Sequence, residues 1–236
     1  MFQRMLASAL IAGVAAGLIA ALLHFAFVQN LIVLGEGYET GELVHFSAAG
    51  PVPAELGADG HDHIAPDATL TLKRNGLTLV FMIALYSAYG FLLVAGFGIA
   101  EAFGRKIGAL EGLVWGIAGF AVFHLSPSMG LAPELPGTIG PDLTLRQFWW
   151  WMTVACTGTG IALLAYGRHW AAFALAGACL AIPHVIGAPE LAGYSGKAPT
   201  ELGALFAARV LGAALVVWAC LGWFAGAAWA REGKRV

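Results

Sequence analysis

Six long apolar runs, separated by short polar segments, dominate this sequence. They cover approximately residues 5–28, 76–100, 109–126, 147–166, 170–187 and 202–229. Each reaches about 18 residues or more, and roughly 20 helical residues at 1.5 Å per residue cross a hydrocarbon core of about 30 Å. The pattern predicts an all-α polytopic integral membrane protein with about six transmembrane helices, forming a single transmembrane domain over residues 1–236.

The composition excludes several classes of protein. Hydrophobic residues make up 59% of the chain and charged residues 11%, whereas soluble domains are about 25% charged. The net charge of −2 leaves no basic surplus for nucleic acid, so membrane lipid is the expected surrounding and nucleic acid is not a partner. No P-loop, HExxH or CxxCH motif occurs, and the three cysteines form no CxxC pair. We therefore expect no enzyme, no catalytic residue and no permanently bound cofactor.

Lysine and arginine residues near the ends of the runs indicate the orientation in the membrane. With a cytoplasmic N-terminus, the inner side holds Arg4, Arg105, Lys106, Arg168, Arg231, Lys234 and Arg235. The outer side then holds Lys73, Arg74, Arg146 and Lys197. This inner excess predicts that both termini are cytoplasmic.

Acidic residues concentrate on the opposite, outer side. Of the 14 acids in the chain, the outer ones are Glu36, Glu39, Glu42, Glu55, Asp59, Asp62, Asp67, Glu134, Asp142, Glu190 and Glu201. Most lie in the polar segment 29–73, which we predict to be an outer loop that acts as a cap or flexible lid. Carboxylates at an entrance raise the local concentration of cations.

Histidines gather on the same side as the acids. His24, His124 and His184 are predicted at similar depth near the outer ends of their helices. Three imidazoles at one depth could converge, and neutral imidazole is a common ligand of Co, Ni, Cu and Zn. Each could instead be a hydrogen-bonded residue near a helix end, so a metal site formed by the three is a hypothesis.

Two polar segments offer further ligands on the outer side. His61 and His63, with His45 as a third donor, suit transient capture of a divalent cation, and a solvated loop tip is the alternative. Glu134 lies in the proline-rich segment 126–137, which would hold its carboxylate near the helix ends. The candidate metal residues are His24, His124, His184, His45, His61, His63 and Glu134.

Other patterns concern the interior of the helices. Arg209 is a deep charge that would either pair with an acid, such as Glu201, Glu134 or Glu190, or act as a gate that a cation displaces. Glu111, near the inner side, is the candidate for a residue that passes the cation on to the exit. Glycines at intervals of four predict close helix packing in lipid. They are Gly13, Gly17, Gly104, Gly108, Gly112, Gly116, Gly222 and Gly226.

Several segments together form a specific pattern. They are Met1-Phe2-Gln3-Arg4 with the helix that follows to His24, Trp115-Gly116 with Phe123-His124-Leu125, residues 130–137, Arg146-Gln147-Phe148-Trp149-Trp150 with Thr153 and Thr157, and residues 183–189. With these segments the chain resembles the CbtA family of predicted cobalt transporter subunits over nearly its whole length. The resemblance implies a multi-pass protein of the bacterial inner membrane that imports cobalt for cobalamin synthesis. It also implies a small companion subunit with one transmembrane helix and a histidine-rich terminus.

Three functions fit these observations. The first is a divalent-cation uptake permease, in which outer acids concentrate the cation, histidines bind it and glycine-packed helices pass it inward. Cobalt as the cargo follows from the resemblance alone, because histidine and carboxylate ligands do not select cobalt. The second is a redox subunit with His124 and His184 as axial haem ligands. The third is a non-transporting scaffold or assembly subunit whose histidines only form hydrogen bonds.

Overall fold

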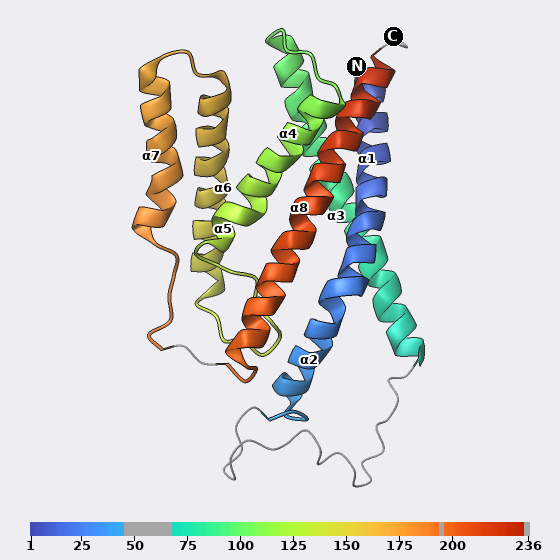
Figure 1. Cartoon of the computed structure of the whole chain (residues 1–236), viewed down its shortest axis with the longest axis vertical. Helices are drawn as coiled ribbons and strands as arrows, with labels where there is room; N and C mark the ends of the chain where they lie inside the picture. Colours follow the sequence, from blue (N-terminus) through green and yellow to red (C-terminus); the bar gives the residue numbers. More distant parts are fainter. Residues whose placement is uncertain (45–67, 194–195, 234–236) are drawn as a thin grey trace.

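The protein is a bundle of helices in the computed structural model, which describes residues 1–44, 68–193 and 196–233. Its elements are α1 (Phe2–Leu23), η1 (His24–Val28), α2 (Gln29–Thr40), α3 (Ala68–Ala102), α4 (Ala109–Phe120), η2 (Ala121–Leu125), α5 (Ser126–Ser128), α6 (Leu143–Tyr166), α7 (Trp170–Ile186) and α8 (Thr200–Glu232). Each η element is a single π-helical turn inside a longer helix, so α1–η1–α2 and α4–η2–α5 are each continuous. Both chain termini lie at the same end of the bundle (Figure 1).

The predicted all-α membrane architecture is confirmed. In the described ranges, five continuous helices are long and apolar enough to cross a membrane, and they are Phe2–Thr40, Thr71–Ala102, Ala109–Ser128, Leu143–Tyr166 and Thr200–Glu232. The sixth helix, α7, is a shorter apolar helix of 17 residues. At 1.5 Å per residue it is about 26 Å long, slightly less than a hydrocarbon core of about 30 Å.

The predicted outer loop 29–73 is shorter than expected, because α2 and α3 extend into it from both ends. Residues 31–34 are four consecutive apolar residues that continue the first helix past its polar interruption. The helix stops at Gly41, whose φ of 86° is a left-handed conformation that favours glycine. The two extensions are joined by an ion pair between Arg74 Nη1 and Glu36 Oε2 at 3.1 Å.

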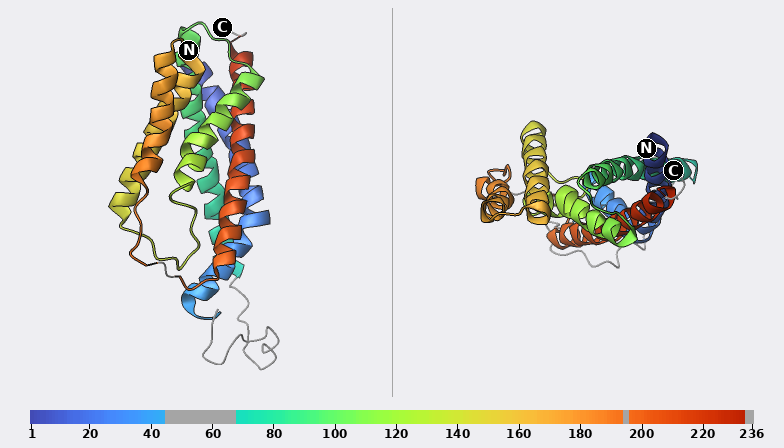
Figure 2. Two further views of the ribbon diagram at one scale, coloured as in Figure 1. Left: turned by 60° about the vertical axis from the view of Figure 1, so that its left-hand side comes forward. Right: turned by 90° about the horizontal axis from the view of Figure 1, so that it is seen from above.

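Small residues bring the core helices together, as the glycine spacing predicts. α1 packs along α3 and α8, and α4 packs along α8 (Figure 2). Gly13 of α1 faces the backbone of Ser87 on α3. A Cβ added to Gly116 would lie 3.0 Å from Gly222 Cα, and one added to Gly222 would lie 2.7 Å from Gly116 Cα. Gly104 is different, because it lies in the turn after α3 with a φ of 80°.

A polar cluster joins three helices at the end that carries the termini. The Arg4 guanidinium donates to both carboxylate oxygens of Glu101 at 2.9 Å and to the Trp229 carbonyl at 2.9 Å. It also lies 3.8 Å from the centroid of the Trp229 ring, whose Nε1–H donates to Glu101 Oε1 at 2.8 Å. We call this group the Arg4–Glu101–Trp229 cluster. It ties α1, α3 and α8 together.

Helices α6 and α7 form a hairpin that stands to one side of the other helices (Figures 1 and 2). Within the hairpin, α6 packs closely on α7, with Gly160 against Leu180. In the described part of the chain, the main contacts of the hairpin with the bundle are those of α6 with η2 and α5. The hairpin is therefore joined to the bundle along a narrow strip.

Candidate cation site

A polar cavity of about 760 Å³ opens between the bundle and the hairpin. It lies beside α5 and the segment that leads into α6, and this segment runs from α5 toward the end opposite the termini (Figure 1). Its walls combine ionisable and aromatic side chains with two prolines, and they include Tyr89, Phe123, His124, Pro127, Glu134, Arg146 and Trp150. His124 and Glu134, two of the predicted metal residues, thus line one cavity.

Glu134 is placed in the cavity by its neighbour in the chain. Leu135 is only 4% exposed and packs in a small apolar cluster with Leu31 of α2 and Phe206 of α8. This anchor fixes the segment between α5 and α6, so Glu134 is held at the cavity wall. Its Oε2 lies 2.8 Å from Arg146 Nη2, and both side chains are 30% exposed. The carboxylate therefore already has a cationic partner.

His124 is held by a tryptophan from the neighbouring helix α8. The residue lies in the π-helical turn η2, and such turns are frequent at functional sites. Trp218 Nε1 donates to His124 Nδ1 at 3.1 Å. Because an indole nitrogen can only donate, Nδ1 must carry the lone pair and the proton of the neutral ring must sit on Nε2.

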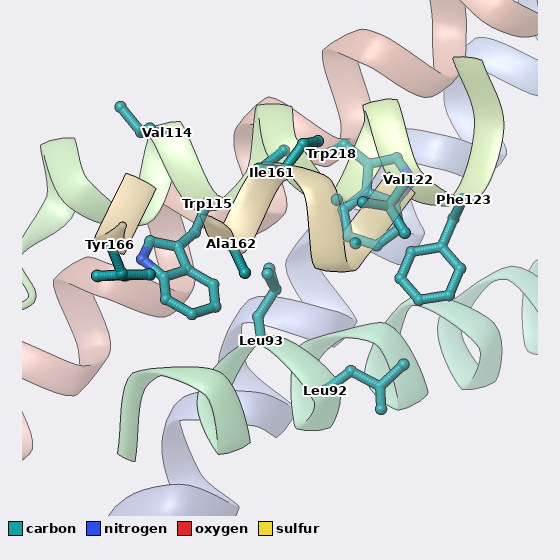
Figure 3. A pocket seen from close by; sticks show the side chains of 13 residues that line it. Leu92, Leu93, Val114, Trp115, Val122, Phe123, Ile161, Ala162, Tyr166 and Trp218 are labelled. Atoms are coloured by element: carbon teal, nitrogen blue, oxygen red, sulfur yellow. The ribbon is translucent and has the colours of Figure 1, made fainter. Parts of the chain in front are cut away.

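Three aromatic rings separate this cavity from a second, apolar one. Trp218 is stacked on Phe123 with centroids 5.6 Å apart and an interplanar angle of 6°, and its ring lies 4.7 Å from that of Tyr89. We call Tyr89, Phe123 and Trp218 the aromatic barrier. Phe123 also lines the apolar pocket of about 340 Å³, in which Phe123 and Trp218 stand at one end and Trp115 and Tyr166 at the other (Figure 3).

His184 lies outside the polar cavity. Its Nε2 is 3.2 Å from Ser126 Oγ, which in turn is 2.8 Å from Thr157 Oγ1 in a buried pair. Pro127, the neighbour of Ser126, lines the cavity. His184 therefore reaches the far side of the same wall, as part of a hydrogen-bonded chain that links α7, α5 and α6.

His24 does not join the other two intramembrane histidines. It begins the π-helical turn η1 and packs edge-on against Phe25. Among the described residues, no group of three or more His, Cys, Asp or Glu side chains is arranged to hold a metal ion. The candidates His45, His61 and His63 lie outside the described residues.

Two other polar residues have different partners from those expected. Arg209 donates from Nη1 to the Phe27 carbonyl in η1 at 3.0 Å, and not to an acid. The π-helical turn changes the regular hydrogen-bonding pattern there, which explains why a carbonyl accepts from a side chain. Glu111 accepts from the Gly108 amide at 2.9 Å and so closes the N-terminus of α4. This capping contact is the role that the structure shows for Glu111, and its role in passing the cation on to the exit stays a prediction.

Sequence reasoning did not assign a role to Arg146, Ser126, Thr157 or Trp218. Arg146 and Thr157 lie in segments that carry the family resemblance, and Arg146 is also one of the basic residues predicted on the outer side. Trp218 lies inside an apolar run, and no local sequence pattern indicates its contact with His124, which is 94 residues away in the chain. Only the packing of α8 against η2 reveals it.

Helices of membrane-spanning length beside an open polar cavity define a multi-pass membrane protein. The family model described as probable cobalt transporter subunit (CbtA) matches residues 2–230, so the chain belongs to this family. The resemblance predicted from the sequence is thereby confirmed. Comparison with the curated proteins and with the solved structures finds no match. Membership of a family of cobalt transporter subunits implies a partner and suggests a role other than catalysis.

Proposed function

We propose that this protein takes up a divalent cation, cobalt in the context of its family, through the polar cavity beside η2. The observation that carries the proposal is that the cavity brings together His124 and Glu134 in a bundle of membrane-spanning helices. An imidazole nitrogen and a carboxylate oxygen are suitable ligands for divalent first-row metals. A cavity of this volume also has room for a cation that keeps several of its water molecules.

The electrostatics of the cavity suit passage rather than permanent binding. Glu134 is neutralised by Arg146 at 2.8 Å, so an arriving cation must compete with a guanidinium for the carboxylate. Such competition weakens binding, and a transport site must release what it captures. The cation is thus cargo, and the chain needs no resident cofactor or catalytic residue.

His184 serves as a second ligand further along the path in this proposal. It contacts Ser126, the neighbour of the lining residue Pro127, so a cation would have to pass this part of the cavity wall to reach it. Of the other predicted ligands, His24, His45, His61 and His63 would act earlier, during capture at the outer face. Haem ligation by His124 and His184 is less well supported, because His184 is not among the residues that line the cavity of His124.

The proposed direction is inward across the bacterial inner membrane. Arg4, Arg105 and Arg168 lie at or beside helix ends on the side of the two termini, and the positive-inside rule assigns such a side to the cytoplasm. The cavity then opens toward the outside. A small companion protein with one histidine-rich helix is the proposed partner, since the family is one of transporter subunits.

Uptake of radiolabelled cobalt tests the proposal in cells that express the chain with its companion. His124→Ala and Glu134→Gln should each lower uptake at least several-fold, because each removes a ligand from the cavity. His169→Ala is the matched control, since His169 is exposed at the start of α7, at the other end of the bundle. Uptake that does not depend on the chain, or that survives both cavity substitutions, would contradict the proposal and favour a scaffold.

A further inference from the structure

We propose that Trp218 is a latch on the cation ligand His124, so that a cation cannot bind this histidine without releasing the indole. The inference rests on the proposed function and adds to it a positioning residue from α8. It starts from the hydrogen bond of 3.1 Å between Trp218 Nε1 and His124 Nδ1. Trp218 is 1% exposed, so the donor side of this bond is buried.

The hydrogen bond leaves His124 without a free lone pair. Its Nδ1 lone pair accepts the hydrogen bond from the indole N–H, and its Nε2 carries the ring proton. A metal ion needs a nitrogen lone pair, and histidine ligands in proteins ordinarily donate their other N–H to an acceptor. In this protein the other nitrogen accepts instead of donating. The histidine is therefore held in a form that does not bind metal.

Both routes to metal binding break the bond with Trp218. A cation that takes Nδ1 occupies the lone pair that the indole uses. A cation that takes Nε2 requires the ring proton to move to Nδ1, and an N–H would then face the N–H of the indole. Two donors cannot bond to each other. Occupancy of His124 is thus coupled to release of Trp218, whichever nitrogen the cation uses.

Release of Trp218 would also change contacts outside the cation site. Its ring fills the space over Gly119 of α4, where a Cβ would lie only 2.6 Å from its Cε3. The same ring belongs to the aromatic barrier between the polar cavity and the apolar pocket, and Figure 3 shows it at the end of that pocket beside Phe123. The latch thereby connects cargo binding to the contact between α4 and α8.

Binding of Co²⁺ to the purified full chain in lipid nanodiscs, measured by calorimetry, tests the latch. Trp218→Phe keeps an aromatic ring and removes the donor. We expect the Kd for Co²⁺ to fall about two- to tenfold, the effect of removing one competing hydrogen bond. His124→Ala should weaken binding, and Trp218→Phe should give no gain in the His124→Ala background. Trp223→Phe, on the exposed face of the same helix, is the control and should leave the Kd unchanged.

The outcomes separate the latch from the proposed function. If His124→Ala leaves Co²⁺ binding unchanged, the proposed cation site is wrong and the latch falls with it. If His124→Ala weakens binding while Trp218→Phe leaves it unchanged or weaker, the latch alone is overturned.

A spectroscopic measurement decides the case if Trp218→Phe does not fold. In the wild-type chain labelled with indole-¹⁵N tryptophan, the signal that shifts in His124→Ala identifies Trp218. Saturation with Zn²⁺, a diamagnetic probe, should move this signal away from its hydrogen-bonded position. A signal that stays in place at saturation would overturn the latch.

Discussion

A cation that binds Glu134 would share the carboxylate charge with Arg146, which contacts Oε2. The pair has one short contact, 2.8 Å, and both partners are partly exposed to the cavity. Measured ion pairs of this kind contribute little, about 0.2–1 kcal/mol. Arg146 is therefore a weak competitor that tunes affinity without preventing entry of the cation.

Replacing this competitor tests its role at the residue scale. Arg146→Gln should lower the KM for cobalt uptake about two- to fivefold, the factor that corresponds to losing an exposed ion pair. Arg168→Gln, an exposed arginine between α6 and α7, should have no effect on the KM. An increase in KM for Arg146→Gln would show that the guanidinium holds Glu134 in its binding position.

The residues of the site differ in how far sequence could reveal them. His124 and Glu134 could be predicted as neighbours because a short proline-rich segment separates them. The convergence of His24 with His124 and His184 could not be settled, because shared depth does not fix which faces of the helices meet. The contact of Trp218 with His124 depends on long-range packing and leaves no local pattern.

At the scale of helices, glycine contacts decide where α4 and α8 meet. Gly112 and Gly116 pack against Gly222 and Gly226, backbone against backbone. Such contacts stabilise helix association in lipid through close van der Waals packing. The spacing of four residues between these glycines could be read from the sequence, and it predicted the close packing of the helices. The π-helical turns were not, because neither His24–Val28 nor Ala121–Leu125 contains glycine or proline.

A pair of glycine substitutions on α8 tests this interface. Gly222→Ala places a Cβ 2.7 Å from the Gly116 backbone, and overpacking of this kind costs about 1–3 kcal/mol. We expect its thermal unfolding temperature in detergent to fall by several degrees. Gly212→Ala is the control on the same helix, since no atom lies within 4 Å of the added Cβ. Equal melting of both variants would contradict the packing argument.

At the scale of the whole molecule, the Arg4–Glu101–Trp229 cluster joins the first helix to the last. Glu101→Gln removes the charge that Arg4 meets with two hydrogen bonds of 2.9 Å. We expect a loss of about 1–3 kcal/mol of stability, typical of leaving a partly buried charged group without its partner. Thermal melts of Glu101→Gln, Arg4→Gln and the double variant measure the coupling. Additive effects of the two single substitutions would show that the pair contributes nothing.

The orientation of the molecule can be tested by terminal fusions. Both termini lie at one end (Figure 1), and the distribution of arginines predicts that this end faces the cytoplasm. A fluorescent protein that matures only in the cytoplasm should fluoresce at either terminus. Alkaline phosphatase, which is active only outside the cytoplasm, should be inactive at both. The reverse result would invert the proposed direction of uptake.

The helices themselves could be predicted from apolar runs, but their arrangement could not, and the orientation inferred from the charges stays a prediction. Hydropathy measures how well a segment suits lipid and does not say which helix it contacts. The extension of α2 and α3 into residues 29–73 was missed because charged residues suggest a loop. One pair of these charges, Glu36 and Arg74, instead joins the two helices.

The hairpin of α6 and α7 is joined to the rest of the molecule only along a narrow strip in the described part of the chain. In lipid the hydrophobic effect does not favour its association with the bundle, so the association depends on close packing and hydrogen bonds. The Ser126–Thr157 pair lies on this seam, and His184 is bonded to it from α7. If a cation binds the His184 nitrogen that is bonded to Ser126, one of the hydrogen bonds that hold the hairpin to the bundle is lost. The hairpin is thus the part of the molecule that an occupied site can shift with the least disturbance to the rest.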